Sequence, residues 1–335
     1  MATATKQTEK AVTMVEAIRQ GIWEEMTADE SVFVIGEDVG EYGGAFKLTE
    51  GFLKHFGPNR IIDTPISEAA IVGAACGAAL MGMKPVAEFQ FIDFISCGFD
   101  MLTNYAAKSR YRGSGAIQAV FRGPCGSGVR GGPFHSINAE AFFLNTAGLK
   151  MVEPSNSYDA KGLIKAAIRD PDPVIFFEHK KLYRLPRLRE ELPEEDYIVE
   201  IGKARIARKG EDLSIITFGA QVLNALDAAE ILEKENDLSV EVIDLRTLSP
   251  LDKGAILATV KKTNRVMILH EASLTGGIGG EISAIIAEEA FEWLDAPPIR
   301  VASIDSPVPF APTMEDYYLP QITEIVEAAR RLAKY

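Results

Sequence analysis

The chain has 335 residues, of which 47% are hydrophobic and 25% are charged, and this length and composition are typical of a globular protein with two domains. The formal net charge of -13 argues against nucleic acid or an anionic membrane as a general partner. Three cysteines without paired spacing indicate neither a disulfide framework nor a zinc site. The first dozen residues resemble no signal or transit segment, so we expect a cytoplasmic protein unless an organellar presequence has been removed.

Short apolar segments rich in β-branched residues alternate with helical patterns along the whole chain. Eight of them are predicted to be strands: 31–36, 84–89, 116–122, 172–178, 213–219, 238–245, 265–271 and 298–304. This alternation predicts an α/β fold with mostly parallel sheets, whose strands are covered by helices on both faces.

A change of composition divides the chain. Between Tyr183 and Val199 the sequence is rich in proline and charge and has no apolar periodicity, which is typical of a linker. We therefore expect an N-terminal α/β domain over 1–185, a linker over 186–200 and a C-terminal α/β domain over 201–335.

Glu68 stands at the start of the longest apolar stretch, residues 69–83. This stretch is shorter than the roughly 20 residues that cross a bilayer, so it predicts a buried helix, with Ser67 as its N-cap. An acid in the first turn interacts favourably with the helix dipole, by about 0.3 to 1 kcal/mol, and needs no further role. However, because small and apolar residues lie on every face, we expect the helix and its first turn to be surrounded by protein. A carboxyl group there can hold a proton near neutral pH and hydrogen-bond a basic ring nitrogen.

Two further segments follow predicted strands, where the carboxyl ends of parallel strands gather ligands. Glu37 and Asp38 come after the first strand and are candidates for a site or for a solvated loop. Phe91 and Phe94 come after the second and offer rings for stacking, or pack in the core.

The segment 122–138 is rich in glycine and contains His135. Glycine permits close approach of the backbone to a ligand, and histidine titrates near neutral pH. A lone histidine is usually structural, but long loops of this kind often carry function, so His135 is a candidate site residue.

Several segments together resemble the beta subunit of the thiamin diphosphate-dependent E1 component of 2-oxo acid dehydrogenase complexes. The resemblance extends from Val12 to the last helix and is carried by the segments VIGEDVGEYGGAFKLTEGF, RIIDTPISEAAIVGAACGAA, PVAEFQFIDF, AAKSRYR, FHSINAEAFF, DAKGLIKAAIRDPDPVIFFEHKKLY and VIDLRTLSPLD. It implies a pyrimidine-binding α/β domain followed by a transketolase-type C-terminal domain. It also implies an enzyme that, with an alpha subunit, oxidatively decarboxylates a 2-oxo acid and reductively acylates lipoyl-lysine on E2.

The resemblance assigns roles to five residues. Glu68 matches the acid that hydrogen-bonds N1′ of the cofactor's aminopyrimidine ring, and proton exchange there activates the cofactor. Glu37 matches an acid close to the cofactor, and Phe91 and Phe94 match positions lining the pyrimidine pocket. His135 matches the histidine of the channel where substrate and lipoyl arm meet.

The resemblance also bears on metals and partners. Some relatives bind potassium at the positions matching Ala119, Ala167, Ile168, Asp170 and Asp172, although the two aspartates also suit a turn before a proline. The GDG segment and following Asn-Asn pair that hold Mg²⁺ and the diphosphate in thiamin enzymes are absent. The resemblance thus implies that an alpha subunit holds Mg²⁺ in an α₂β₂ heterotetramer, with surfaces on the C-terminal domain for a second beta chain and for E2.

The substrate stays open at this stage. Phe94 favours the pyruvate and acetoin types, whereas FHSINAEAFF is more like the branched-chain type. An acetoin dehydrogenase beta subunit and a non-catalytic partner for assembly or E2 docking are the alternatives.

Overall fold

The computed structural model describes residues 10–335 and divides into two compact units. The first unit comprises residues up to Cys125 together with 145–201, and the second comprises 126–144 together with 202–335. The glycine-rich loop, defined here as residues 126–144, therefore belongs to the second unit, although it connects two strands of the first. The division into 1–185, 186–200 and 201–335 stays a prediction, and a single boundary along the sequence does not describe this loop.

The first unit is built on a parallel sheet in which its strands follow the order β5-β6-β4-β3-β1-β2. The strands are β1 (Val32–Gly36), β2 (Ile61–Asp63), β3 (Lys84–Glu88), β4 (Val120–Cys125), β5 (Lys150–Val152) and β6 (Val174–His179). The four strands predicted for this region are confirmed. The third starts at Val120 instead of residue 116, because its parallel pairing with Val86 and Val174 begins there.

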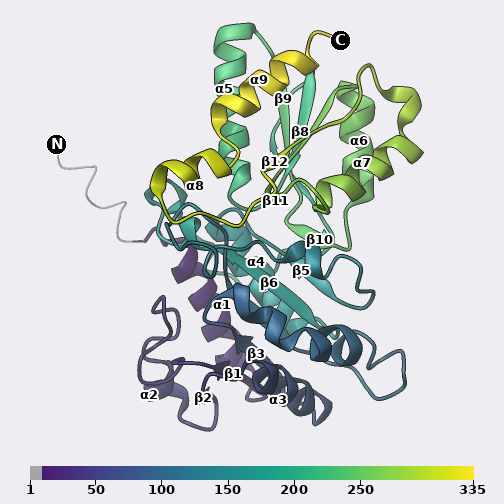
Figure 1. Ribbon diagram of the computed structural model, residues 1–335. Coiled ribbons are helices and arrows are strands. Elements are labelled where there is room, and N and C mark those ends of the chain that lie inside the picture. Colours follow the sequence, from purple (N-terminus) through teal and green to yellow (C-terminus); the bar gives the residue numbers. More distant parts are fainter. Residues whose placement is uncertain (1–9) are drawn as a thin grey trace, which may run out of the picture. The chain divides into compact units, whose positions relative to one another are not determined.

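Four α-helices accompany this sheet (Figure 1): α1 (Met14–Ala28), α2 (Phe52–Phe56), α3 (Glu68–Leu80) and α4 (Ser157–Arg169). Thr13 and Glu16 form a reciprocal capping box at the start of α1, which satisfies helix N–H groups that have no partner within the helix. Ser67 is the N-cap of α3 as predicted, but its hydroxyl donates to the carbonyl oxygen of Pro65 instead of accepting from the helix.

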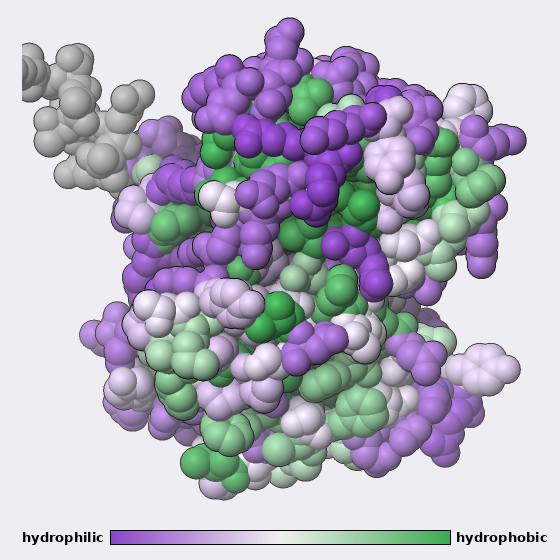
Figure 2. Space-filling view, turned by 45° about the horizontal axis from the view of Figure 1, so that its top comes forward, coloured by the Kyte–Doolittle hydropathy of each residue, from purple (hydrophilic) through white to green (hydrophobic). Residues whose placement is uncertain are grey.

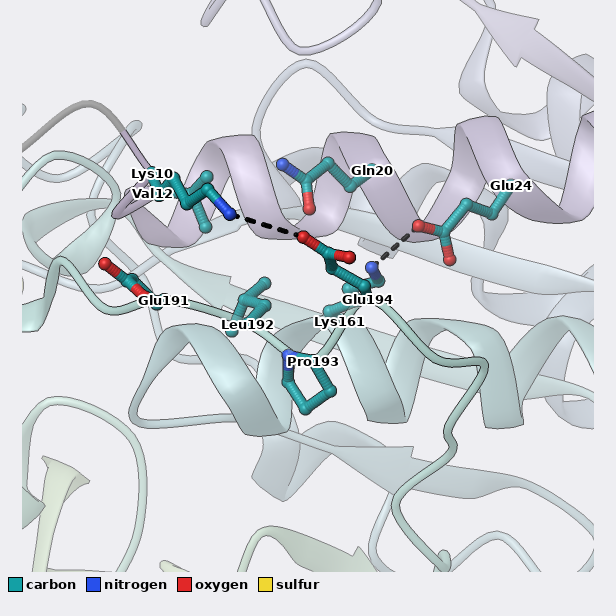
Figure 3. Close-up of a pocket in the computed structure, with 9 residues that line it drawn as sticks. All are labelled: Lys10, Val12, Gln20, Glu24, Lys161, Glu191, Leu192, Pro193 and Glu194. Carbon is teal, nitrogen blue, oxygen red and sulfur yellow. Dashed lines mark hydrogen bonds and ion pairs between the residues drawn. The ribbon is translucent and has the colours of Figure 1, made fainter.

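The segment predicted as a linker packs against α1 and α4. Asp196 forms ion pairs with Lys165 and Arg169 of α4. Figure 3 shows a pocket beside this segment, with a volume of about 370 Å³, where Lys10 pairs with Glu194 and Lys161 pairs with Glu24 of α1. Because these charges already have partners, we assign the pocket no ligand.

A buried ionic network lies in the centre of the first sheet. Arg122 of β4 is 2% exposed and binds the carboxylates of Glu88 on β3 and Glu178 on β6. The hydroxyl of Tyr183 donates to Glu178 at 2.6 Å. Desolvation raises the pKa of Glu88, although the neighbouring guanidinium acts in the opposite direction. Neighbouring strands are therefore linked through one buried cation as well as through their backbones.

The second unit has a sheet of the order β12-β11-β8-β9-β7, in which only β7 is antiparallel to its neighbour. Its strands are β7 (Arg205–Arg208), β8 (Leu213–Thr217), β9 (Val240–Asp244), β11 (Val266–Ser273) and β12 (Ile299–Ser303), and a short strand β10 (Thr247–Ser249) follows β9. The four strands predicted for this region are confirmed. The edge strand β7 was not predicted, because its sequence alternates arginine with apolar residues over four positions only.

Helices cover both faces of the second sheet. Figure 1 shows α5 (Gln221–Asn236) and α9 (Ile322–Leu332) on one face and α6 (Lys253–Thr263) and α7 (Ile278–Glu289) on the other, with α8 (Pro312–Tyr318) before α9. Within residues 10–335, no helix is both long and apolar enough to cross a membrane.

The Arg122 network predicts a large loss of stability on substitution. Arg122→Met leaves two buried carboxylates without their cation, which typically costs about 3–5 kcal/mol. We expect the thermal midpoint of the first unit to fall by roughly 10 °C, measured by differential scanning calorimetry. Arg330→Met removes the exposed pair with Glu235 and serves as the control, since such pairs contribute about 0 to 1 kcal/mol. Equal midpoints for the two variants would contradict the importance of the network.

Candidate active site

Three segments of the first unit meet at the carboxyl edge of its parallel sheet, where α/β proteins bind ligands. Glu37 directly follows β1, and Phe91 lies just after β3. Glu68 is the first residue of α3, which follows β2, the neighbour of β1. The structure therefore brings residues far apart in the sequence to one edge because β2, β1 and β3 are adjacent.

Glu37 is a buried carboxyl group that lacks a full set of partners. It is 7% exposed, and its Oε1 atom is buried without a hydrogen-bond partner among residues 10–335. Desolvation raises the pKa of Glu37, the neighbouring Glu68 raises it further, and the backbone N–H of Ser67 opposes both effects. Buried oxygens without a protein partner are rare in folded proteins, and they commonly mark a place that a proton, a water molecule or a ligand completes.

Glu68 is half-buried at the start of α3. The expectation that this helix is surrounded by protein on every face is wrong for the chain by itself. Its buried side is formed by Ile71, Val72, Ala75, Cys76 and Ala79, whereas Ala69, Ala70, Ala74 and Gly77 are exposed. Residue types show that a helix is apolar, but they do not show which chain covers it.

The exposed side of α3 is bordered by large apolar side chains. Ile66 before the helix is 83% exposed and Met81 after it is 84% exposed. Figure 2 shows apolar and near-neutral residues gathered over the first unit, in the lower part of the view. Exposed apolar patches of this kind mark interaction surfaces.

The two predicted aromatic residues are half-buried after β3. The ring of Phe91 lies edge-on to Phe46 at 5.7 Å between centroids, and the ammonium of Lys180 lies 6.0 Å from its centroid. Phe94 lies in the short helical turn Ile92–Gly98 and bonds back to the carbonyl of Phe91. Their part in binding a pyrimidine ring stays a prediction.

His135 lies in the second unit, on the glycine-rich loop, and is half-buried. The loop closes on itself through the bond from Gly126 N–H to Ile137 O, at 3.1 Å, and turns back at His135, whose N–H bonds Gly132 O. Of the five residues predicted to bind the cofactor or act in catalysis, four therefore lie in the first unit and His135 lies in the second.

The same loop contains a buried carboxyl group that sequence reasoning missed. Glu140 is 1% exposed, and neither of its carboxylate oxygens has a hydrogen-bond partner among residues 10–335. Desolvation and the nearby carboxylate of Glu271 on β11 raise its pKa to about 7. Tyr318 also faces this pair, and burial together with both glutamates raises the pKa of its hydroxyl. The short apolar segment 141–144, directly after Glu140, was the one sequence signal for its burial.

The two aspartates predicted to bind potassium already pair with basic side chains of the first unit. Lys150 donates to both oxygens of Asp170 at 2.7 Å, and Arg110 donates to Asp172 at 2.8 Å. These carboxylates are therefore poorly suited to bind a second cation.

The carbonyl oxygens of the same segment fit potassium better. Ala119, Ala167 and Ile168 each accept one hydrogen bond, from the N–H groups of Val174 and Asp170 and from the side chain of Gln118. Each carbonyl oxygen has a second lone pair, and backbone carbonyls are the groups that replace water around potassium. Potassium at this turn stays a prediction, and these carbonyls are the groups that fit it.

Comparison with known proteins gives matches over nearly the whole chain. The model of the transketolase pyrimidine binding domain matches residues 10–186, and that of the transketolase C-terminal domain matches residues 202–325. The 2-oxoisovalerate dehydrogenase subunit beta of Bacillus subtilis (strain 168) is 47% identical over 324 residues, which cover 96% of this chain and 98% of that protein. The pyruvate dehydrogenase E1 component subunit beta of Staphylococcus aureus (strain COL) is 44% identical over 97% of this chain and 99% of its own length.

A plant relative and two solved structures extend this picture. The mitochondrial pyruvate dehydrogenase E1 component subunit beta-2 of Oryza sativa subsp. japonica is 45% identical over 96% of this chain and 86% of its own length. A split gene transketolase, solved as an inactive beta4 tetramer, has a TM-score of 0.79 at 20% identity over 96% of this chain and 98% of its own. A transketolase from Leishmania mexicana has a TM-score of 0.71 at 18% identity, over 98% of this chain and 46% of its own. These structures show the same two-domain α/β fold.

Glu140 predicts a pH-dependent stability that one substitution removes. Its pKa in the folded chain is about 7, against a usual value of 4.5, so folding favours the protonated form. The stability that depends on this protonated carboxyl group is fully present below about pH 4.5. The free energy of unfolding then falls as the pH rises through 7, by roughly 3 kcal/mol in all. Glu140→Gln stays neutral, so we expect it to melt close to the wild type at pH 5 and several degrees above it at pH 8.

The measurement is the difference in melting temperature between the two proteins across this range. Glu288→Gln, at an exposed position of α7, controls for the loss of one charge. A difference that does not change with pH would contradict the raised pKa of Glu140.

Proposed function

The chain belongs to the family of E1 beta subunits of the pyruvate and branched-chain 2-oxo acid dehydrogenase complexes, and from this premise we propose how its residues serve the reaction. The family's enzymes are thiamin diphosphate-dependent and act with an alpha subunit. In our proposal this chain, together with its alpha subunit, decarboxylates a 2-oxo acid and transfers the acyl group to lipoyl-lysine on E2. The observation that carries the proposal is the pair of adjacent carboxyl groups, Glu37 and Glu68, at the carboxyl edge of the first sheet.

The residues at this edge suit an aminopyrimidine ring. The unpartnered oxygen of Glu37 is an open hydrogen-bonding position beside Glu68. Half-buried Phe91 and Phe94 offer apolar surface for a flat heterocycle. Thiamin diphosphate, when bound, supplies the carbon nucleophile for the 2-oxo group and accepts the electron pair left after decarboxylation.

Glu68 is proposed to exchange a proton with N1′ of that ring. Two neighbouring carboxyl groups in partly desolvated surroundings disfavour two negative charges, so one of them tends to keep a proton. Burial and the carboxylate of Glu68 raise the pKa of Glu37, so Glu37 is the member of the pair that favours its protonated form. His135 is proposed to act later in the same reaction, as a proton donor or acceptor during acyl transfer to the lipoyl group.

The chain is proposed to hold only part of the cofactor. Since its sequence lacks the GDG and Asn-Asn segments, Mg²⁺ and the diphosphate are assigned to the alpha subunit. Among residues 10–335, no three His, Cys, Asp or Glu side chains are grouped as metal ligands. Potassium is assigned to the carbonyl oxygens near Ala119 and Ala167.

The proposed assembly is an α₂β₂ heterotetramer in the cytoplasm, with E2 as a further partner and contacts from a second beta chain. The exposed side of α3 is the surface best suited to a partner chain, because it carries small residues that follow Glu68 along the helix. A partner there would also complete the burial of that carboxyl group. Relatives of both the pyruvate and the branched-chain kind match this chain, so both substrates belong in the assay.

The role of Glu68 is tested by Glu68→Gln in the heterotetramer produced with the alpha subunit. The amide cannot exchange the proton, so we expect turnover of pyruvate and 3-methyl-2-oxobutanoate, followed by dye reduction, to fall at least about 100-fold. Gel filtration should show unchanged assembly. Glu288→Gln is the matched control, and full turnover by the Glu68 variant would refute the proposed role.

The proposed partner surface is tested at Gly77. A Cβ atom added there meets no heavy atom within 4 Å, and Gly77 is exposed. The side chain of Gly77→Leu can therefore extend into solvent in the separate chain, and leucine favours the helix more than glycine does. We expect this variant to fold normally but to lose assembly with the alpha subunit, measured by co-purification. Gly77→Ala, whose single methyl group is far smaller, should still assemble. Normal assembly of the leucine variant would place the interface elsewhere.

A further inference from the structure

Two buried carboxylates hold the glycine-rich loop against the rest of the second unit. They come from elements far from the loop in the sequence. Glu271 of β11 is 7% exposed and Glu315 of α8 is fully buried. Both accept hydrogen bonds from the backbone of the loop, from Ser127 N–H at 2.7 Å and from Gly128 N–H at 2.9 Å. Charged acceptors of this kind make stronger hydrogen bonds than neutral ones.

One oxygen atom of Glu271 joins the two arms of the loop. Its Oε1 accepts from the N–H of Ser127 on one arm and from the side-chain amide of Asn138 on the other, at 2.7 and 3.0 Å. The arms also bond each other, since the Ser127 hydroxyl donates to Ser136 O at 3.1 Å. His135 lies between these two anchored positions, so the place of its backbone depends on this carboxylate.

Glu315 anchors the outer part of the loop. It accepts from Arg130 at 2.6 Å, and the same guanidinium bonds Asp316 at 2.8 Å. Arg130 has a positive φ of 64°, a conformation that non-glycine residues adopt only when the surroundings hold them there. Its ion pairs with Glu315 and Asp316 provide that restraint, close to His135 in the sequence.

We propose that Glu271, with Glu315 as a second anchor, is a positioning residue for His135. The inference rests on the proposed function of His135 in acyl transfer. A loop with several glycines has many accessible conformations, and a displacement of about 1 Å at a reacting group can lower a rate by about 100-fold. By holding both arms of the loop, the second unit contributes directly to the chemistry and is more than an assembly surface.

A merely structural role makes a different prediction. If Glu271 only stabilises the second unit, its removal lowers the melting temperature and affects every activity in proportion to the folded fraction. If it positions His135, the loss falls on the step that His135 serves, and a second substitution at His135 adds little. A double-mutant cycle separates the two cases.

The experiment uses the heterotetramer with Glu271→Ala, His135→Gln and the double variant. Dye reduction with the 2-oxo acid and reductive acylation of a purified lipoyl domain are measured separately, together with the melting temperature. We expect Glu271→Ala to lose about 10-fold to 100-fold in the step that His135→Gln affects, and the double variant to be no slower than His135→Gln. Glu271→Gln retains one acceptor oxygen and should recover part of the activity, and it replaces the alanine variant in the cycle if that variant does not fold. Glu288→Gln is the neutral control.

Three outcomes would overturn the inference. One is full activity of a folded Glu271 variant, and another is a double variant whose losses multiply. The third is full activity of His135→Gln, which removes the residue that Glu271 is said to position. None of these outcomes bears on the role of Glu68, because that role is tested separately by Glu68→Gln.

Discussion

The proximity of two carboxyl groups, Glu37 and Glu68, is the constraint on which the proposed chemistry depends. Parallel pairing of β1 with β2 places the end of one strand beside the start of the helix that follows the other. Burial and mutual repulsion then raise the pKa of Glu37, so the site favours holding a proton. The arrangement does not stabilise the fold, because Glu37 is a buried acid with an oxygen that lacks a partner, and such a group costs free energy. The cost is consistent with a site that gains its missing partner from a ligand.

The first unit leaves a surface exposed that the proposed alpha subunit would cover. Its longest apolar helix is covered on one side only, and the open side carries small residues behind Glu68. The second unit takes part in a different way, since two of its carboxylates hold the loop that carries His135. In the first unit, Arg122 links three neighbouring strands through the carboxylates of Glu88 and Glu178.

Much of the fold was predictable because strands covered on both faces read as continuous apolar segments. The three-residue strands β2, β5 and β10 and the charged edge strand β7 do not have this signature, and they were missed. Motif resemblance predicted Glu37 and Glu68 as site residues, but residue types do not show how many sides of α3 are covered. They also do not show that Glu140 is buried or that 126–144 belongs to the second unit. The last two features depend on contacts across more than 100 positions of sequence, such as Ser127 with Glu271.

The central claim is that Glu68 delivers or accepts the proton that activates bound thiamin diphosphate. The most direct measurement is the rate of hydrogen–deuterium exchange at C2 of the thiazolium ring, followed by proton NMR after rapid quenching of the loaded heterotetramer. If the claim is correct, exchange is fast in the wild type and slower by at least about 100-fold in Glu68→Ala. Equal exchange rates in two heterotetramers that bind the cofactor equally well would contradict it.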